Sequence, residues 1–311
     1  MPAIFLNRSL RVGTRGSPLA LAQTEMVRRH LAAADASFAE PAALAVEVIR
    51  TTGDRVLDRP LAEVGGKGLF SKEIDDAMLA GRIDIAVHSV KDLPTWLPEG
   101  IVLAAVLPRA DPRDVLIAAV SRIADLPPGA VVGTSSPRRQ AQILARRPDL
   151  RTALLRGNVH TRLARVAEGA VAATLLARAG LCRLGLAETG SVVEPDEMLP
   201  AVGQGAVGIT CRTDDGAVRE MLGAIDDAQA AREVTAERCM LAALDGSCRT
   251  PIGGLARHDR DGLTLRGVVA RPDGSLMLEG IRHGNISDGP AMGEDLGRDL
   301  RSRAGPDFFE P

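Results

Sequence analysis

Short apolar runs alternate with segments of helical period through the first two thirds of the 311-residue chain. Leu19, Ala22, Met26, Val27 and Leu31 recur at the spacing of one helix face, which predicts the first helix. Runs continuous in Val, Ile, Leu and Ala that alternate with helices indicate a mostly parallel sheet covered on both faces. The runs that predict strands are residues 10–14, 45–51, 83–90, 101–107, 115–120, 130–134, 151–155 and 172–177.

The last third has a different pattern. A long helix is predicted over about residues 227–244. Two Asp-Gly pairs after it are hairpin turn signals between short apolar runs, so this part predicts a small α+β domain with a three-stranded antiparallel sheet. The runs are residues 252–256, 263–270 and 275–281, and the pairs are Asp261-Gly262 and Asp273-Gly274.

A short sequence motif occurs twice, each time at the end of a predicted strand, and we call this repeat the echo. Residues 12–18 read VGTRGSP and residues 132–137 read VGTSSP, and each predicts a strand, a tight turn, a Ser N-cap and a Pro that opens a helix. Capping alone explains the Ser-Pro pairs. It does not explain Arg15, Arg138 and Arg139, because the positive end of a helix dipole repels them. An anion between them would, so we expect two lobes with an interlobe cleft for a multiply negative ligand.

The amino-acid composition is typical of a globular protein. Hydrophobic residues are 45% and charged residues 25%, as in ordinary globular proteins. We find no apolar run near the roughly 18 residues of a membrane span and no signal-peptide pattern. Four cysteines without a C-x-x-C spacing favour a reducing cytoplasm. Net charge of −2 and aromatics of only 2% argue against nucleic acid as a partner.

Arginine supplies nearly all of the positive charge. The 38 basic residues include only three lysines, Lys67, Lys72 and Lys91, so the other 35 are arginines. Residues 138–165 hold eight arginines and a single acid, Asp149. The planar guanidinium binds carboxylates and phosphates in a bidentate way. Most of the 35 fit a solvated surface, but this segment also fits a site for an acidic ligand.

One motif suggests a nucleotide cofactor that its context does not support. Residues 203–208 match the dinucleotide pattern G-x-G-x-x-G, but a strand and not a helix is predicted after them. We interpret them as a turn that feeds a strand back into the first lobe. The five histidines have no ligand spacing, so no metal is expected.

Three further segments are candidates for chemistry. Lys91 and Asp92 follow a predicted strand at the edge where α/β sheets bind ligands. Residues 52–68 form a loop long enough to be a lid, or simply a surface loop. Cys248 lies in a loop after the long helix, whereas Cys182, Cys211 and Cys239 lie in periodic segments and are expected to be buried.

Taken together, these motifs resemble the porphobilinogen deaminase family. The matches follow one another in order over most of the chain and thin out after about residue 256. They include TRGSPLA at 14–20, VGGKGLF at 64–70, DIAVHSVKD at 84–92, LRGNV at 155–159, GSCRTPIG at 246–253, and residues 132–140, 179–185 and 199–208.

The resemblance implies an enzyme that joins four porphobilinogen molecules head to tail with release of ammonia and hydrolyses the product to hydroxymethylbilane. It implies a dipyrromethane cofactor bound to Cys248 by a thioether, with Asp92 as the catalytic residue. The remaining implied roles are cofactor binding by Lys91, Ser135, Arg138 and Arg139, substrate binding by Arg15, Ser17, Arg156, Arg162 and Arg183, and a lid with Lys67 and Phe70.

The resemblance also implies two α/β lobes like those of periplasmic solute-binding proteins, plus the C-terminal α+β domain. We expect residues 1–108 and 201–224 in the first lobe, 109–200 in the second and 225–311 in the third domain. A cytoplasmic monomer without metal or nucleotide is expected. The competing hypotheses are a non-catalytic binding protein for a small polyanion and a dinucleotide-dependent oxidoreductase.

Overall fold

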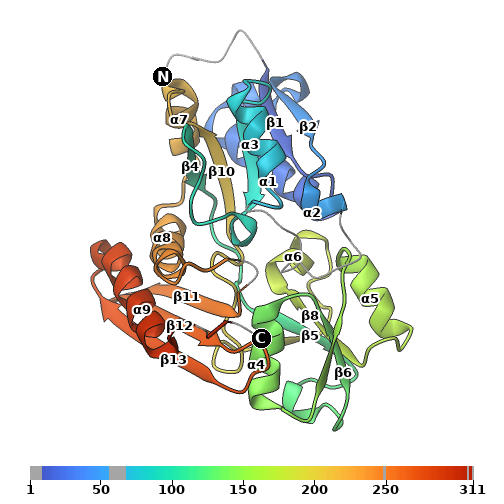
Figure 1. Cartoon of the computed structure of the whole chain (residues 1–311). Helices are drawn as coiled ribbons and strands as arrows, with labels where there is room; N and C mark the ends of the chain where they lie inside the picture. The colour runs from blue at the N-terminus through green and yellow to red at the C-terminus, as the bar shows by residue number, and fades with distance from the viewer. Residues whose placement is uncertain (1–8, 56–67, 248–249, 307, 310–311) are drawn as a thin grey trace. The chain divides into compact units, whose positions relative to one another are not determined.

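The computed structural model describes residues 9–55, 68–247, 250–306 and 308–309 of the chain (Figure 1). The described residues divide into two units, which we treat separately. The first contains residues up to 55, residues 68–109 and residues 206–231, and the second contains residues 110–205 and those from 232 onward. The three-domain division expected from the sequence stays a prediction.

The first unit is built on a five-stranded sheet with the order β2-β1-β3-β10-β4. Neighbours β2, β1 and β3 pair in parallel, and β10 runs antiparallel to both β3 and β4. The mostly parallel sheet is thus confirmed, as is the strand predicted after the G-x-G-x-x-G segment. The bounds are β1 (Leu10–Thr14), β2 (Leu44–Val48), β3 (Ile85–Ser89), β4 (Ile101–Val106), β10 (Val207–Arg212), α1 (Pro18–Ala34), α2 (Thr52–Arg55), α3 (Lys72–Leu79) and α7 (Gly216–Gly223).

Both faces of this sheet are buried at its central strand β3. Ile85 and Val87 of β3 belong to one apolar cluster together with Val27 of α1 and residues of α7. Ala86, between them, belongs to another cluster with Ile74 of α3. Neighbouring strand residues point to opposite faces, so an apolar run without polar alternation is what this position requires.

The second unit contains a sheet with the order β7-β6-β8-β5-β9, in which β7, β6 and β8 are parallel and β5 is antiparallel to β8 and β9. Ile143 of α4 packs in the cluster on one face, and Leu181 of α6 packs in the cluster on the other. The bounds are β5 (Asp114–Ala118), β6 (Val131–Thr134), β7 (Arg151–Leu154), β8 (Ala173–Ala177), β9 (Ser191–Val193), α4 (Pro137–Arg146), α5 (Val159–Ala167) and α6 (Arg178–Arg183).

The C-terminal part of the second unit confirms the predicted three-stranded antiparallel sheet. Its order is β11-β12-β13, with β11 (Ile252–Asp259), β12 (Gly262–Ala270) and β13 (Met277–Gly284). The long helix predicted before it is α8 (Ala228–Ala243). The sequence pattern did not predict α9 (Gly289–Ala304), because glycine has low helix propensity. Gly289, Gly293 and Gly297 let α9 approach α8, where an added Cβ would meet residues 236–243.

Two expectations about local structure need correction. Residues 52–55 of the expected loop form the short helix α2, and residues 56–67 lie outside the described part of the chain. Cys182 was expected to be buried and is exposed. It lies on α6, whose buried residues are Ala179, Gly180 and Leu181, so its side chain lies on the opposite side of the helix.

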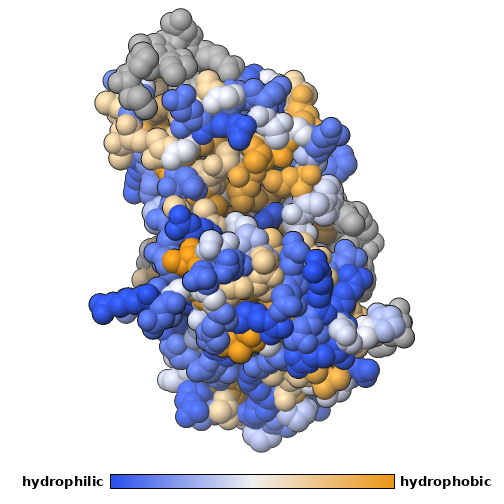
Figure 2. All heavy atoms as spheres, turned by 90° about the vertical axis from the view of Figure 1, so that its left-hand side faces the viewer, coloured by the Kyte–Doolittle hydropathy of each residue, from blue (hydrophilic) through white to orange (hydrophobic). Residues whose placement is uncertain are grey.

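The surface agrees with the composition. On the face shown in Figure 2, hydrophilic residues predominate in the lower part of the view, and apolar residues gather mainly in the upper part. Within residues 9–55, 68–247 and 250–306, the structure has no helix with the length and hydropathy needed to span a bilayer.

Candidate active site

Each copy of the sequence echo forms the predicted strand, turn and capped helix. Ser17 caps α1, and its Oγ accepts a hydrogen bond from the Ala20 backbone N–H at 3.2 Å. Ser136 caps α4, and its Oγ accepts from the Arg139 N–H at 3.4 Å. A proline opens each helix. The echo therefore marks equivalent positions in the two sheets.

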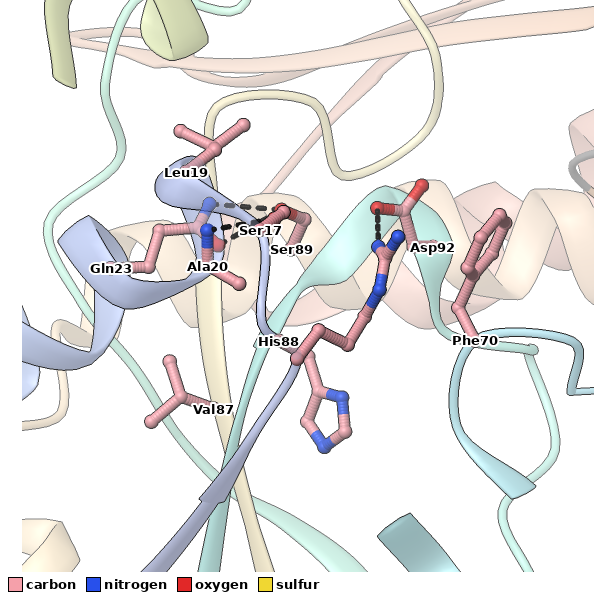
Figure 3. Close-up of a pocket in the computed structure, with 10 residues that line it drawn as sticks. Ser17, Leu19, Ala20, Gln23, Phe70, Val87, His88, Ser89 and Asp92 are labelled. Carbon is pink, nitrogen blue, oxygen red and sulfur yellow. Dashed lines mark hydrogen bonds and ion pairs between the residues drawn. The ribbon is translucent and has the colours of Figure 1, made fainter. Parts of the chain in front are cut away.

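A pocket in the first unit lies where α1 begins and β3 ends. Three-residue helix η4 (Val90–Asp92) follows β3 directly and brings Asp92 to this edge. The structure thus brings together four of the residues named from the sequence, Arg15, Ser17, Phe70 and Asp92 (Figure 3). Among the described residues, the pocket is lined by Arg15, Ser17, Leu19, Ala20, Gln23, Phe70, Val87, His88, Ser89 and Asp92.

Arg15 is the central cation of this pocket. Its Nε and Nη2 donate to the Asp54 carboxylate, with Nη2–Oδ1 at 2.5 Å, and its Nη1 lies 3.9 Å from Asp92 Oδ2. Its guanidinium carbon is 4.3 Å from the centre of the Phe70 ring, a cation–π contact. Burial acts to lower the pKa of Arg15, but the Asp54 hydrogen bond and the charges of Asp92 and Asp54 outweigh it and raise that pKa. Arg15 is therefore a permanent positive charge beside Asp92.

Polar groups on the other side of the pocket are neutral. Gln23 and Ser89 point toward each other, with Gln23 Nε2 donating to Ser89 Oγ at 2.9 Å (Figure 3). The His88 ring is buried, and its Nε2 lies 3.0 Å from Thr210 Oγ1. Burial, helped by the charge of Arg15, lowers the pKa of His88 to about 4. The imidazole is thus uncharged at neutral pH.

In the second unit, Arg138 and Arg139 flank a fully buried carboxylate. Asp114 at the start of β5 lies 2.8 Å from Nη2 of each arginine. Gln204 Nε2 donates to the same carboxylate at 2.9 Å. Burial acts to raise the pKa of Asp114, but the two guanidinium charges lower it well below its usual range. The cluster contains two cations and one anion, a net positive charge inside the second unit.

The other residues named in the second unit are less enclosed. Arg162 Nη2 lies 3.3 Å from Ser135 Oγ, and Arg156 lies in the segment that joins β7 to α5. Arg183 ends α6 and donates from Nη2 to the Gly205 carbonyl at 2.6 Å. Burial lowers the pKa of Arg183. The structure therefore links Ser135 to Arg162 and places Arg183 at the turn before β10.

The structure gives less detail for three of the residues named from the sequence. Lys91 lies beside Asp92 in η4 and is half-buried. Lys67 and Cys248 lie outside the described residues, so the lid and the thioether position stay predictions. The described residues contain no group of three or more His, Cys, Asp and Glu side chains arranged to hold a metal ion.

Neither aspartate that pairs with the helix-start arginines was predicted from the sequence. The sequence pattern suggested an external anion beside those arginines, whereas the structure gives Arg15 a partner in Asp54 and gives Arg138 and Arg139 a partner in Asp114. Asp114 could have been noticed, because it immediately precedes a buried strand. Asp54 carried no signal beyond its place in a glycine-containing loop.

The fold and the pocket define a class of protein: two α/β lobes with a small α+β domain, and an aspartate beside a partly buried arginine at the end of a strand. Comparison with known proteins narrows that class. Residues 10–220 match the family model for the dipyrromethane cofactor-binding domain of porphobilinogen deaminase, and residues 231–302 match its C-terminal domain. The chain belongs to the porphobilinogen deaminase family.

Individual relatives agree with the family match. Porphobilinogen deaminase of Paracoccus denitrificans is 55% identical over 303 residues, covering 97% of this chain and 96% of the relative. The chloroplastic porphobilinogen deaminase of Oryza sativa is 53% identical over 306 residues, covering 97% of this chain and 86% of the relative. This family membership disfavours the polyanion-binding and oxidoreductase hypotheses.

Solved structures with a similar arrangement include periplasmic solute-binding proteins. A TRAP periplasmic solute-binding protein from Desulfovibrio salexigens matches with a TM-score of 0.41 and 12% identity, covering 72% of this chain and 73% of the other. The fold assignment rests on the strand orders described above.

Proposed function

We propose that this protein is a transferase that condenses four porphobilinogen molecules head to tail, releases ammonia at each addition and hydrolyses the linear product to hydroxymethylbilane. Family membership over nearly the whole chain supports the substrate class. The single observation that carries the chemistry is the Asp92 carboxylate, which lines a pocket next to the partly buried cation Arg15. A cytoplasmic monomer is part of the same proposal.

Asp92 has the properties that this reaction needs. Loss of ammonia from porphobilinogen leaves a cation whose charge is shared with the pyrrole nitrogen. A carboxylate beside that nitrogen stabilises the developing charge and moves protons to and from the ring. The side chain of Asp92 is 30% exposed, so it is accessible to a substrate while its position is constrained by the pocket. Ser17 and Arg15, at the start of α1, would bind the substrate carboxylates.

The residues of the chain also fit a dipyrromethane, which carries several carboxylates. The Nε groups of Arg138, Arg139 and Arg183 are buried and have no hydrogen-bond partner among the described residues. Buried guanidinium donors of this kind favour carboxylate ligands. Cys248 would hold the cofactor through a thioether, and Lys91, Ser135, Arg138 and Arg139 would bind its acidic groups. When bound, the group supplies the pyrrole to which the first substrate unit is joined.

The remaining assignments follow the same chemistry. Each pyrrole of the product carries an acetate and a propionate, so elongation adds two negative charges per unit. Arg156, Arg162 and Arg183 would bind these groups, and Lys67 and Phe70 would cover the pocket. The tether would keep the growing chain bound between additions, an effective-concentration advantage.

Intact-mass measurement with an activity assay tests the proposal. We expect purified protein to exceed its sequence mass by two deaminated porphobilinogen units and to release ammonia from porphobilinogen. Cys248→Ser should lack both the extra mass and the activity. Cys239→Ser, on α8, is the matched control and should retain both. Protein that matches its sequence mass and does not consume porphobilinogen would contradict the proposed function.

A further inference from the structure

The guanidinium of Arg15 is fixed along one edge and over one face. Asp54 accepts from Nε at 3.1 and 3.2 Å and from Nη2 at 2.5 Å, so the whole Nε–Nη2 edge is engaged by one carboxylate. The Phe70 ring lies 4.3 Å from the guanidinium carbon. Only the Nη1 side is turned toward Asp92, at 3.9 Å. A planar fork held in this way has its orientation set by the chain itself.

Asp54 is itself held in place by its own segment. Its Oδ2 accepts from Thr51 Oγ1 at 2.8 Å and from the Thr51 N–H at 3.3 Å, and Thr51 is fully buried. The Gly53 N–H donates to the Leu69 carbonyl at 2.8 Å. A Cβ on Gly53 would collide with the Phe70 ring. The carboxylate on the edge of Arg15 and the ring on its face are thus connected through one small cluster.

The attraction between Arg15 and Asp92 explains why a second carboxylate, that of Asp54, is needed beside Arg15. At 3.9 Å, Arg15 and Asp92 are already within ion-pair distance. In a partly buried site their attraction is several times stronger than in water. Without Asp54, the guanidinium would be drawn onto the oxygens of Asp92 and would occupy the group that must face the substrate. Asp54 supplies the counter-charge instead.

The second unit also pairs arginines near a Ser-Pro helix start with an internal aspartate, although these arginines follow the proline, whereas Arg15 precedes Ser17. Arg138 and Arg139, at the other Ser-Pro helix start, have their Nη2 atoms on Asp114. In both units an aspartate from another segment of the chain supplies the counter-charge to arginines near the helix start.

We propose that Asp54 is a positioning residue, which holds Arg15 by its Nε–Nη2 edge and thereby keeps the carboxylate of Asp92 available to the substrate. The inference rests on the proposed function insofar as it assigns the reaction to Asp92. The arrangement of Arg15 can be tested separately from the activity.

The test compares Asp54→Asn with Glu25→Gln in the purified holoprotein. Both variants remove one negative charge from the first unit, but Glu25 pairs with Arg28 and Arg29 on α1 and lies outside the pocket lining. We expect Asp54→Asn to lower kcat by about tenfold or more while KM for porphobilinogen changes by less than about threefold. Glu25→Gln should leave both constants unchanged.

Crystal structures of the same variants supply the second measurement. In Asp54→Asn, we expect an Arg15 Nη atom within about 3.2 Å of an Asp92 oxygen, a direct pair. Thr51→Val, which removes one hydrogen bond to Asp54, should change kcat in the same direction by a smaller factor and keeps the inference testable if Asp54→Asn does not fold.

The outcomes separate cleanly. A loss in kcat together with the movement of Arg15 supports the proposal. A kcat within about twofold of the unsubstituted protein, or a loss in kcat with Arg15 still in place, overturns it. If the unsubstituted protein and Glu25→Gln both fail to consume porphobilinogen, the proposed function fails, and the position of Arg15 in the Asp54→Asn crystal still decides whether Asp54 holds it.

Discussion

The carboxylate of Asp114 lies 2.8 Å from Nη2 of Arg138, and both side chains are almost completely buried. Arg138 also donates from Nη1 to the Leu199 carbonyl at 2.6 Å. Desolvation of two charges is unfavourable, and mutual attraction compensates for it only while both partners are present. Removal of either partner is therefore expected to destabilise the second unit.

Asp114→Ala should destabilise the protein by about 3–5 kcal/mol, because it leaves Arg138 and Arg139 as buried cations without a counter-ion. Urea unfolding measures the change. Asp149→Asn removes an exposed carboxylate that pairs with the half-buried Arg147, and should cost far less stability than Asp114→Ala. Equal effects of the two substitutions would mean that the buried carboxylate has no special role.

Substitution of Asp92 tests the proposed catalytic role directly. Asp92→Glu keeps a carboxylate on a longer side chain and should leave slow turnover, whereas Asp92→Ala should nearly abolish it. Single-turnover assays on folded, cofactor-loaded protein distinguish a loss of chemistry from a loss of loading. If the Ala variant reacted within about tenfold of the unsubstituted rate, the role would belong to another residue.

Local signals in the sequence predicted much of the fold. The Ser-Pro starts of α1 and α4 were predicted because capping depends on neighbouring residues alone. Buried strands such as β3 were predicted because an apolar run reports burial on both faces. Helix α9 was missed because its glycines serve close packing against α8, which local propensity does not report.

The partners of the arginines could not be predicted in the same way. Asp54 is 39 residues from Arg15, and Asp114 is 25 residues from Arg139. In each case the pairing depends on how separate segments are brought together around a sheet. The arginine pattern therefore correctly indicated that negative charge must lie near these arginines. The interpretation from sequence assigned that charge to a ligand alone.

The burial of Asp75 on α3 indicates that replacing this residue with a neutral one would stabilise the protein. The residue is 4% exposed, and its Oδ1 has no hydrogen-bond partner in the part of the chain that the structure describes. Burial raises the pKa of Asp75 to about 6. The native state therefore holds its proton more tightly than the unfolded state, and stability is lost as pH rises from about 4 through 6.

Asp75→Asn removes the charged form and should raise the free energy of unfolding at pH 8 by about 1–2 kcal/mol. Asp76→Asn is the comparison, because the neighbouring carboxylate is exposed and pairs with Lys72 at 2.8 Å. Its charge also helps to raise the pKa of Asp75, so this substitution should bring a smaller gain than Asp75→Asn. Denaturant unfolding at pH 8 compares the two, and a loss of stability in Asp75→Asn would show that the ionised carboxylate has a partner that favours it.

The contribution of His88 to the stability of the protein should depend on pH with the opposite sign. Its pKa is lowered to about 4 by burial and by the charge of Arg15. An ordinary histidine in the unfolded chain has a pKa of about 6.5, so the unfolded state binds more protons between these values. Stability from the neutral native imidazole is therefore present above about pH 6.5 and is lost as pH falls toward 4.

The expected loss through His88 between pH 7 and pH 5 is about 2 kcal/mol. Asp75 titrates in an overlapping range with the opposite sign, so absolute stabilities at pH 5 mix the two effects. A comparison with His88→Gln isolates the histidine, because Asp75 is unchanged in both proteins. We expect the change in unfolding free energy from pH 7 to pH 5 to be more favourable in the variant than in the unsubstituted protein by about 2 kcal/mol. His283→Gln, at an exposed position of β13, should show the same change as the unsubstituted protein, and identical pH profiles for His88→Gln and the unsubstituted protein would show that His88 is not held neutral.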